Sequence, residues 1–101
     1  MKLIDNTAVK TSNNKGYTMH KIVGIVKNML NTSNTFDEFN NAFRALEDNL
    51  EKTDFMVFFS TGDDFGYDEK HEWNWYFNVT NMARGNEKTY DITEEIDALR
   101  D

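Results

Sequence analysis

Residues 35–50 read TFDEFNNAFRALEDNL, and this stretch decides the fold class because it predicts a helix with a clear start and one apolar face. Thr35 and Glu38 form a capping box, in which the threonine hydroxyl accepts a hydrogen bond from the Glu38 N–H and the Glu38 carboxylate reaches back. Apolar residues then recur at helical spacing, so a core must lie on that side. The apolar face consists of Phe36, Phe39, Phe43, Leu46 and Leu50.

A second amphipathic helix is predicted just before this one, over residues 18–30. Its apolar residues fill a stripe of roughly 160° at 100° per residue, and its other face carries polar residues and glycine. The segment 31–34 reads NTSN, which is typical of a loop between two helices. The stripe consists of Met19, Ile22, Val23, Ile25, Val26, Met29 and Leu30.

Strand patterns follow the two helices. Residues 55–59 are a continuous apolar run, which predicts a central strand covered on both faces. In residues 73–80, Trp73, Trp75, Phe77 and Val79 alternate with polar residues and Tyr76, so we expect a strand with one buried face. A turn at 83–87 leads to a third strand at 88–92.

A short closing helix is expected after Asp91, because Asp91 and Glu94 have the spacing of a second capping box. The predicted fold is therefore α+β in the order ααβββα, with about three antiparallel strands packed against two helices in two layers. We expect residues 17–101 to form a single domain. Residues 1–16 are expected to be a flexible arm or an edge strand.

The charge of the chain is divided unevenly. Residues 1–34 carry five lysines and one acid, a net of +4, whereas residues 35–101 carry six basic residues and seventeen acids, a net of −11; together they give −7. So lopsided a distribution favours a positively charged partner. It disfavours direct binding of nucleic acid, because contact with phosphates needs a basic patch.

No motif for catalysis is apparent. The chain has no cysteine, neither of its two histidines has another histidine or a cysteine nearby, and its five glycines form no phosphate loop. We therefore expect no enzyme, no metal and no cofactor. No leader peptide is apparent, and no apolar run approaches the ~20 residues that span a bilayer, so we expect a cytoplasmic protein without membrane contact.

The loop predicted at residues 60–71, together with Glu72, is rich in acids. An EF-hand is excluded, because its glycine stands sixth, whereas Gly66 is fourth from Asp63. Three interpretations stay open: a solvated hairpin loop, a contact surface for a basic partner, and a weak cation site. The acids are Asp63, Asp64, Asp68, Glu69 and Glu72.

Three aromatic residues bear on this choice. Phe65 and Tyr67 lie inside the acidic loop, where rings and charges together are typical of a binding hot spot; the alternative is that both rings fold back onto the sheet. Tyr76 shares the polar face of its strand. It is presented outward if only one face of the sheet is covered, and is ordinary core if both are.

The leading functional hypothesis is a small acidic inhibitor that blocks the basic nucleic-acid-binding surface of a nuclease or defence effector, with carboxylates standing in for phosphates. Its size, acidity and lack of cysteine are similar in character to those of phage- or mobile-element-encoded anti-CRISPR and anti-restriction proteins, which act in the host cytoplasm. The loop acids are the expected contacts, with Glu47, Asp48 and Glu51 on the outer helix face second.

Two alternatives remain. An immunity protein or antitoxin that neutralises a basic toxin would present a similar acidic face. A regulatory subunit that forms a homodimer through Tyr76 and its neighbours would not need a basic partner. The sequence leaves open whether the protein is a monomer or a homodimer.

Overall fold

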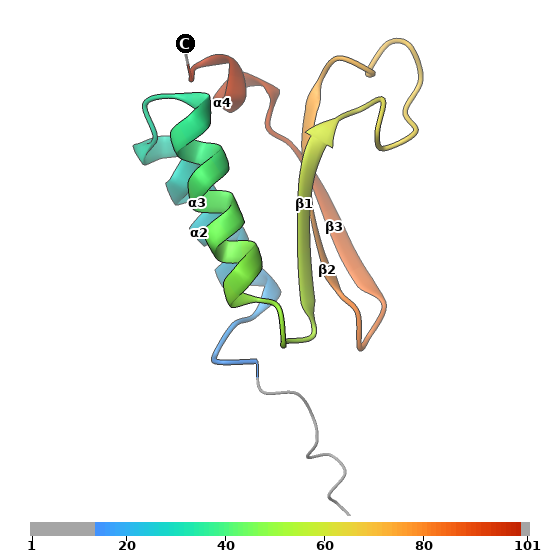
Figure 1. Ribbon diagram of the computed structural model, residues 1–101. Coiled ribbons are helices and arrows are strands. Elements are labelled where there is room, and N and C mark those ends of the chain that lie inside the picture. The colour runs from blue at the N-terminus through green and yellow to red at the C-terminus, as the bar shows by residue number, and fades with distance from the viewer. Residues whose placement is uncertain (1–13, 100–101) are drawn as a thin grey trace, which may run out of the picture.

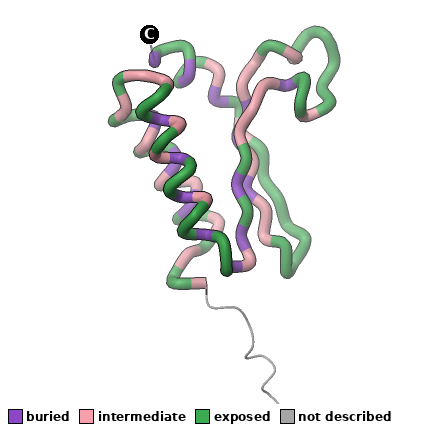
Figure 2. The backbone as a smooth tube through the Cα atoms, viewed as in Figure 1, coloured by how far each residue is buried: buried purple, intermediate pink, exposed green. Residues whose placement is uncertain are grey.

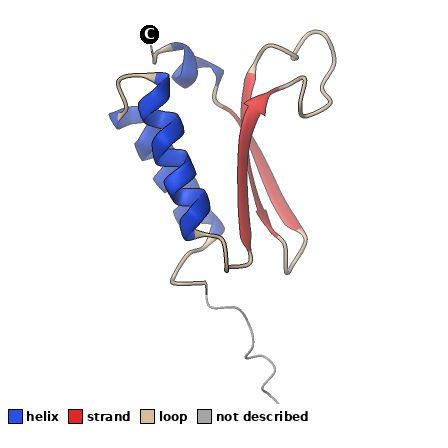
Figure 3. Ribbon diagram, viewed as in Figure 1, coloured by secondary structure: helices blue, strands red, loops and turns tan. Residues whose placement is uncertain are grey.

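The computed structural model describes residues 14–99, so most of the predicted arm at 1–16 lies outside the described residues. The elements follow the predicted order ααβββα, and the α+β class is confirmed (Figures 1 and 3). They are α2 (Met19–Thr32), α3 (Phe36–Asn49), β1 (Phe55–Thr61), β2 (Trp75–Asn81), β3 (Asn86–Asp91) and α4 (Thr93–Asp97).

The three strands form one antiparallel sheet in the order β1-β2-β3. Phe59 of β1 lies opposite Phe77 of β2, and Phe77 lies opposite Tyr90 of β3. Both long helices lie against the same face of this sheet (Figure 1). The opposite face has no helix over it among the described residues, and it is called the open face below.

The core lies between the helices and the sheet, where the inward faces are buried (Figure 2). The ring of Phe43 on α3 lies 4.7 Å from that of Phe59 and 6.0 Å from that of Phe77. Ile22 and Val26 supply the buried face of α2. The helical periodicity therefore predicted the correct inward residues on both helices.

Side chains stabilise the helix starts largely as predicted. The Thr35 hydroxyl accepts from the Glu38 N–H at 3.2 Å, and the Glu38 carboxylate accepts from the Asn34 N–H at 2.8 Å. The second predicted capping box is wrong. Asp91 accepts from the N–H of Thr93, at 2.9 Å, and Ile92 is the N-cap of α4 without a side-chain cap.

The prediction that residues 55–59 form a central strand covered on both faces is wrong. β1 is an edge strand, and β2 is central. Met56 and Phe58 point to the open face and are 49% and 44% exposed. Only Phe55, Val57 and Phe59 face the core, because two helices cover one side of a three-stranded sheet and leave the other side bare.

β2 begins two residues later than the strand predicted at 73–80. Trp73 was expected on its buried face, but β2 begins at Trp75 and Trp73 is 75% exposed. The Asn74 N–H donates to the His71 carbonyl at 3.1 Å, so the chain is still turning at Trp73. The inward face of β2 is formed by Trp75, Phe77 and Val79.

Candidate functional site

The open face of the sheet carries the most distinctive surface of the described residues. Strand register sets Phe58, Asn78 and Thr89 side by side, and next to them Met56, Thr80 and Glu87. With residues from the acidic loop and from α3, they line a groove of about 690 Å³. This surface is called the groove below; its residues are Glu47, Met56, Val57, Phe58, Asp64, Phe65, Tyr67, Asn78, Thr80, Glu87 and Thr89.

Rings from the loop between β1 and β2 form one end of the groove. The Phe65 ring lies 5.3 Å from that of Phe58 and stacks on Tyr67 at 5.8 Å. Tyr67 in turn meets Tyr76 edge to face at 4.6 Å, and Tyr76 is only 8% exposed. Both loop rings therefore fold back onto the sheet, and Tyr76 is buried under them although no helix within residues 14–99 covers that face.

Backbone hydrogen bonds explain why the loop folds back. The Gly62 N–H donates to the Asn74 carbonyl at 2.8 Å, which continues the β1–β2 pairing. The Gly62 carbonyl then accepts from the N–H groups of Phe65 and Tyr67, each at 3.0 Å. These two bonds close a tight turn that holds both rings close to Gly62 and the end of the sheet.

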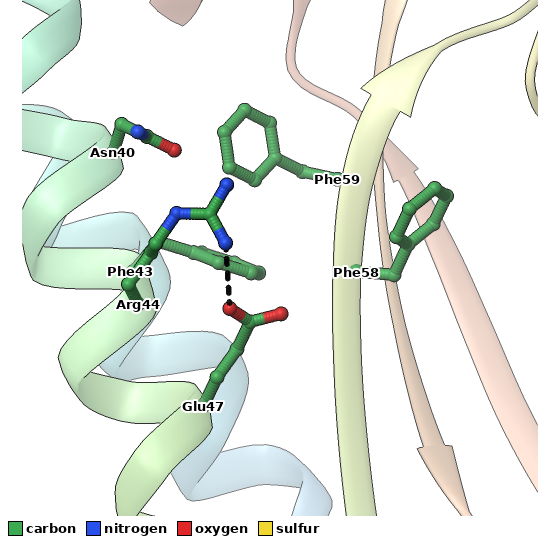
Figure 4. A pocket seen from close by; sticks show the side chains of 6 residues that line it. All are labelled: Asn40, Phe43, Arg44, Glu47, Phe58 and Phe59. Atoms are coloured by element: carbon green, nitrogen blue, oxygen red, sulfur yellow. Dashed lines mark ion pairs between the residues drawn. The ribbon is translucent and has the colours of Figure 1, made fainter.

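Carboxylates from three elements lie around the apolar part of the groove. Glu47 of α3 pairs with Arg44 at 3.7 Å beside the edge of β1, where Phe58 and Phe59 point to opposite faces (Figure 4). Asp64 accepts a short hydrogen bond from the Ser60 hydroxyl. Glu87 accepts from the Asn78 amide at 3.1 Å.

Charge in the groove is therefore unbalanced. Of its three carboxylates, only that of Glu47 has a cationic partner among residues 14–99. Asp64 and Glu87 lie next to exposed rings, and their hydrogen-bond partners, a hydroxyl and an amide, carry no positive charge to balance a carboxylate. Glu87 is also exposed, so its charge faces solvent.

The other predicted acids do not join this site. Asp68 and Glu69 line a separate shallow hollow with Lys70. Asp63 is exposed and Glu72 is half-buried, and neither has a side-chain hydrogen bond or ion pair within residues 14–99. Asp48 and Glu51 are exposed near the end of α3, and the acidic loop lies at the opposite end of β1 (Figure 1). The acids thus do not form one continuous face.

The pKa of Asp68 in the acidic loop is shifted downward. Its carboxylate lies 2.8 Å from the His71 Nδ1, and this hydrogen bond lowers the pKa of Asp68 because it favours the ionised form. A depressed folded-state pKa stabilises the fold above the ordinary pKa of the carboxyl. That contribution is lost as the pH falls through the lowered pKa.

Replacing His71 should remove the largest cause of this shift, while the backbone N–H groups of residues 70 and 71 still lower the pKa of Asp68 slightly. In the His71→Ala variant, we expect the pKa of Asp68 to rise towards its ordinary range, as measured by NMR titration of the side-chain carboxyl. Lys70→Ala is the matched control, because it leaves the hydrogen bond intact and should keep the pKa of Asp68 low. An unchanged Asp68 titration in His71→Ala would show that the pair does not form in solution.

The sequence patterns did not predict the apolar centre of the groove. The apolar run at 55–59 predicts that Met56 and Phe58 are core residues, and the turn pattern at 83–87 includes Glu87. The number of helices could have indicated this surface. Two helices of 14 residues cover only one face of a sheet, and side chains alternate between the faces of a strand. Every second residue of the 55–59 run therefore faces away from the helices. The predicted residues Glu47, Asp64, Phe65 and Tyr67 do line the groove.

Within residues 14–99, no three histidine, cysteine or acidic side chains converge closely enough to hold a metal ion. Over the same residues, no helix has the length and apolar character that a membrane crossing requires. Comparison of the chain with models of protein families, with curated proteins and with solved structures gave no match.

Proposed function

We propose that this protein is a small acidic inhibitor that binds a basic surface of a protein partner through the groove. The observation that supports the proposal is the composition of the groove. Exposed side chains of Met56, Phe58 and Tyr67 lie beside the carboxylates of Asp64 and Glu87, which have no cationic partner among the described residues.

This composition suits a partner rich in lysine and arginine. Interface energy concentrates at apolar and aromatic anchors, while charges around them steer the encounter and set its specificity. Arginine in particular both pairs with carboxylates and stacks on aromatic faces. The groove offers both features within one surface, so it fits a basic patch better than an apolar one.

A basic patch on a protein is often a nucleic-acid-binding surface, since phosphate contacts depend on lysine and arginine. We therefore propose that the partner is a nuclease or a defence effector, and that the inhibitor competes with its DNA or RNA in the manner of phage-encoded anti-CRISPR or anti-restriction proteins. An immunity protein for a basic toxin would use the same groove, and the identity of the captured partner distinguishes the two.

Reversing two charges of the groove should weaken inhibition. We expect Asp64→Lys combined with Glu87→Lys to reduce affinity for the partner about tenfold or more, because two attractive contacts become repulsive. The measurement is competition with a labelled DNA for a candidate nuclease or effector, at low and at high salt. Inhibition by the unmodified protein should weaken as salt rises.

The matched control is Asp48→Lys combined with Glu51→Lys, which changes the net charge equally but lies outside the groove. It should retain most of the inhibition. Equal losses in both variants would show that net charge acts without a specific surface, and salt-independent inhibition would count against competition for a basic site. Thermal unfolding of all variants would confirm that each is folded.

A further inference from the structure

The free edge of β1 has no blocking residue within the strand itself. Its seven residues, FMVFFST, include no charged residue, no proline and no glycine, and the register with β2 runs without a bulge. The other free edge, β3, carries Glu87, Lys88 and Asp91. Natural sheets usually block their edges with charges, prolines or bulges, so an edge without them is suited to pairing with another strand.

Two hydrogen bonds fix which backbone groups of β1 point outward. Met82 N–H donates to the Asp54 carbonyl, and Gly62 N–H donates to the Asn74 carbonyl, one at each end of the ladder. Bonded pairs alternate along an antiparallel ladder. Met56, Phe58 and Ser60 are therefore bonded to β2, and the odd-numbered residues turn their N–H and C=O groups to the free edge.

At each end of this edge, one backbone group already has a hydrogen-bond partner within the chain. The Phe55 N–H donates to the Thr53 hydroxyl at 3.1 Å, and the Thr61 carbonyl accepts from the Asp64 N–H at 3.1 Å. The edge thus offers the Phe55 carbonyl, both groups of Val57, both groups of Phe59 and the Thr61 N–H.

We propose that this edge pairs with the same edge of a second copy, antiparallel, with Phe58 on the two-fold axis. In that register, Val57 exchanges both hydrogen bonds with the partner's Phe59, and Thr61 donates to the carbonyl of the partner's Phe55. The Phe55 N–H falls opposite the carbonyl of the partner's Thr61, and each of these groups already has a hydrogen bond within its own chain. Every offered group is therefore paired.

Charges next to the edge favour a second copy over a foreign basic strand. Arg44 is the only basic residue of α3, and it lies with Glu47 beside Phe58 and Phe59 (Figure 4). A two-fold axis at Phe58 brings each Arg44 towards the partner's Glu47, so the charges at the axis balance. A lysine-rich strand from another protein would instead meet Arg44.

Such a dimer has a six-stranded sheet with one continuous open face. Phe58 and the partner's Phe58 lie side by side on that face, because residues at a non-hydrogen-bonded position are about 4.5 Å apart between Cα atoms. The two grooves then join across the axis. The dimer does not depend on the proposed inhibition, and it needs no contribution from Tyr76, which is buried.

Sedimentation and hydrogen exchange test the dimer. We expect a monomer–dimer equilibrium that shifts towards dimer as salt rises, because salt screens the repulsion between two copies of charge −7 each. At a concentration where about nine-tenths of the chains are paired, exchange of the Val57 and Phe59 amides should slow about tenfold. The Met56 and Phe58 amides, which β2 already protects, should change little.

Variants locate the interface. Phe58→Lys should abolish the dimer, because it places two lysines opposite each other at the axis; its exposed position spares the core. Met82→Lys, at a residue 54% exposed in the turn after β2, is the matched control and should still dimerise. Arg44→Glu should weaken the dimer, and adding Glu47→Arg should restore it.

A protein that stays monomeric at millimolar concentration in high salt would overturn the proposal. So would a dimer that Phe58→Lys leaves intact. Protection of Val57 and Phe59 that appears only on addition of a basic protein would also overturn it, and would identify a strand of that protein as the occupant of the edge.

Discussion

Replacing Phe43 with alanine should lower the free energy of unfolding by about 3–5 kcal/mol, the cost of emptying a buried phenylalanine site. Phe43 is 2% exposed, and its ring contacts Phe39 at 5.8 Å as well as Phe59 and Phe77 on two strands. Truncation therefore loosens the helix layer and the sheet together. Since small domains are stable by only about 5–15 kcal/mol, the variant should be close to unfolding.

Urea denaturation followed by far-ultraviolet circular dichroism measures this loss. The matched control is Phe58→Ala, which removes the same ring from the open face of the adjacent strand and should cost less than about 1 kcal/mol, as exposed sites usually do. At a protein concentration low enough to keep the chain monomeric, a loss at Phe58 as large as that at Phe43 would contradict the assignment of the open face, because it would mean that another part of the same chain covers Phe58.

Replacing Gly62 with alanine should destabilise the protein by about 3 kcal/mol, near the upper end of what overpacking costs. An added Cβ would lie 2.1 Å from the His71 carbonyl oxygen and 3.2 Å from the Tyr76 ring. The first of these atoms belongs to the backbone, so no rotamer change relieves the clash. The loop must separate from the end of β1, which exposes Tyr76.

Two readouts separate this effect from simple unfolding. Denaturation gives the loss of stability, and NMR of Tyr67 and Tyr76 reports whether their edge-to-face contact is broken. Gly24→Ala is the control: nothing lies within 4 Å of the added Cβ on the exposed face of α2, so the helix should gain about 0.5–1 kcal/mol. A neutral Gly62→Ala would mean that the loop is not closed as the structure has it.

The sequence predicted those parts of the fold that depend on local patterns. The helix at 36–49 followed from a capping box and a 3.6-residue period, and both of these signals involve residues within a few positions of each other. The alternation from Trp75 to Val79 gave the inward face of β2 for the same reason. Strand count and antiparallel direction followed from turns between consecutive strands.

The position of β1 in the sheet could not be predicted in this way. An apolar run such as Phe55-Met56-Val57-Phe58-Phe59 is typical of a strand covered on both faces, and nothing within the run shows which face is open. The strand order is decided by pairing with residues 14–26 positions away. The error at β1 hid Met56 and Phe58, which are the apolar centre of the candidate site.

Each pair of strands that are neighbours in the sheet is also consecutive along the chain, and the helices precede them side by side. Strand pairing therefore needs no partner from elsewhere in the chain, whereas α2 can pack fully only once β2 and α4 are present. Closing short loops costs little entropy, and folds dominated by such contacts cross their folding barrier quickly. The unprotected edge of β1 is therefore exposed to wrong partners only briefly while the chain folds.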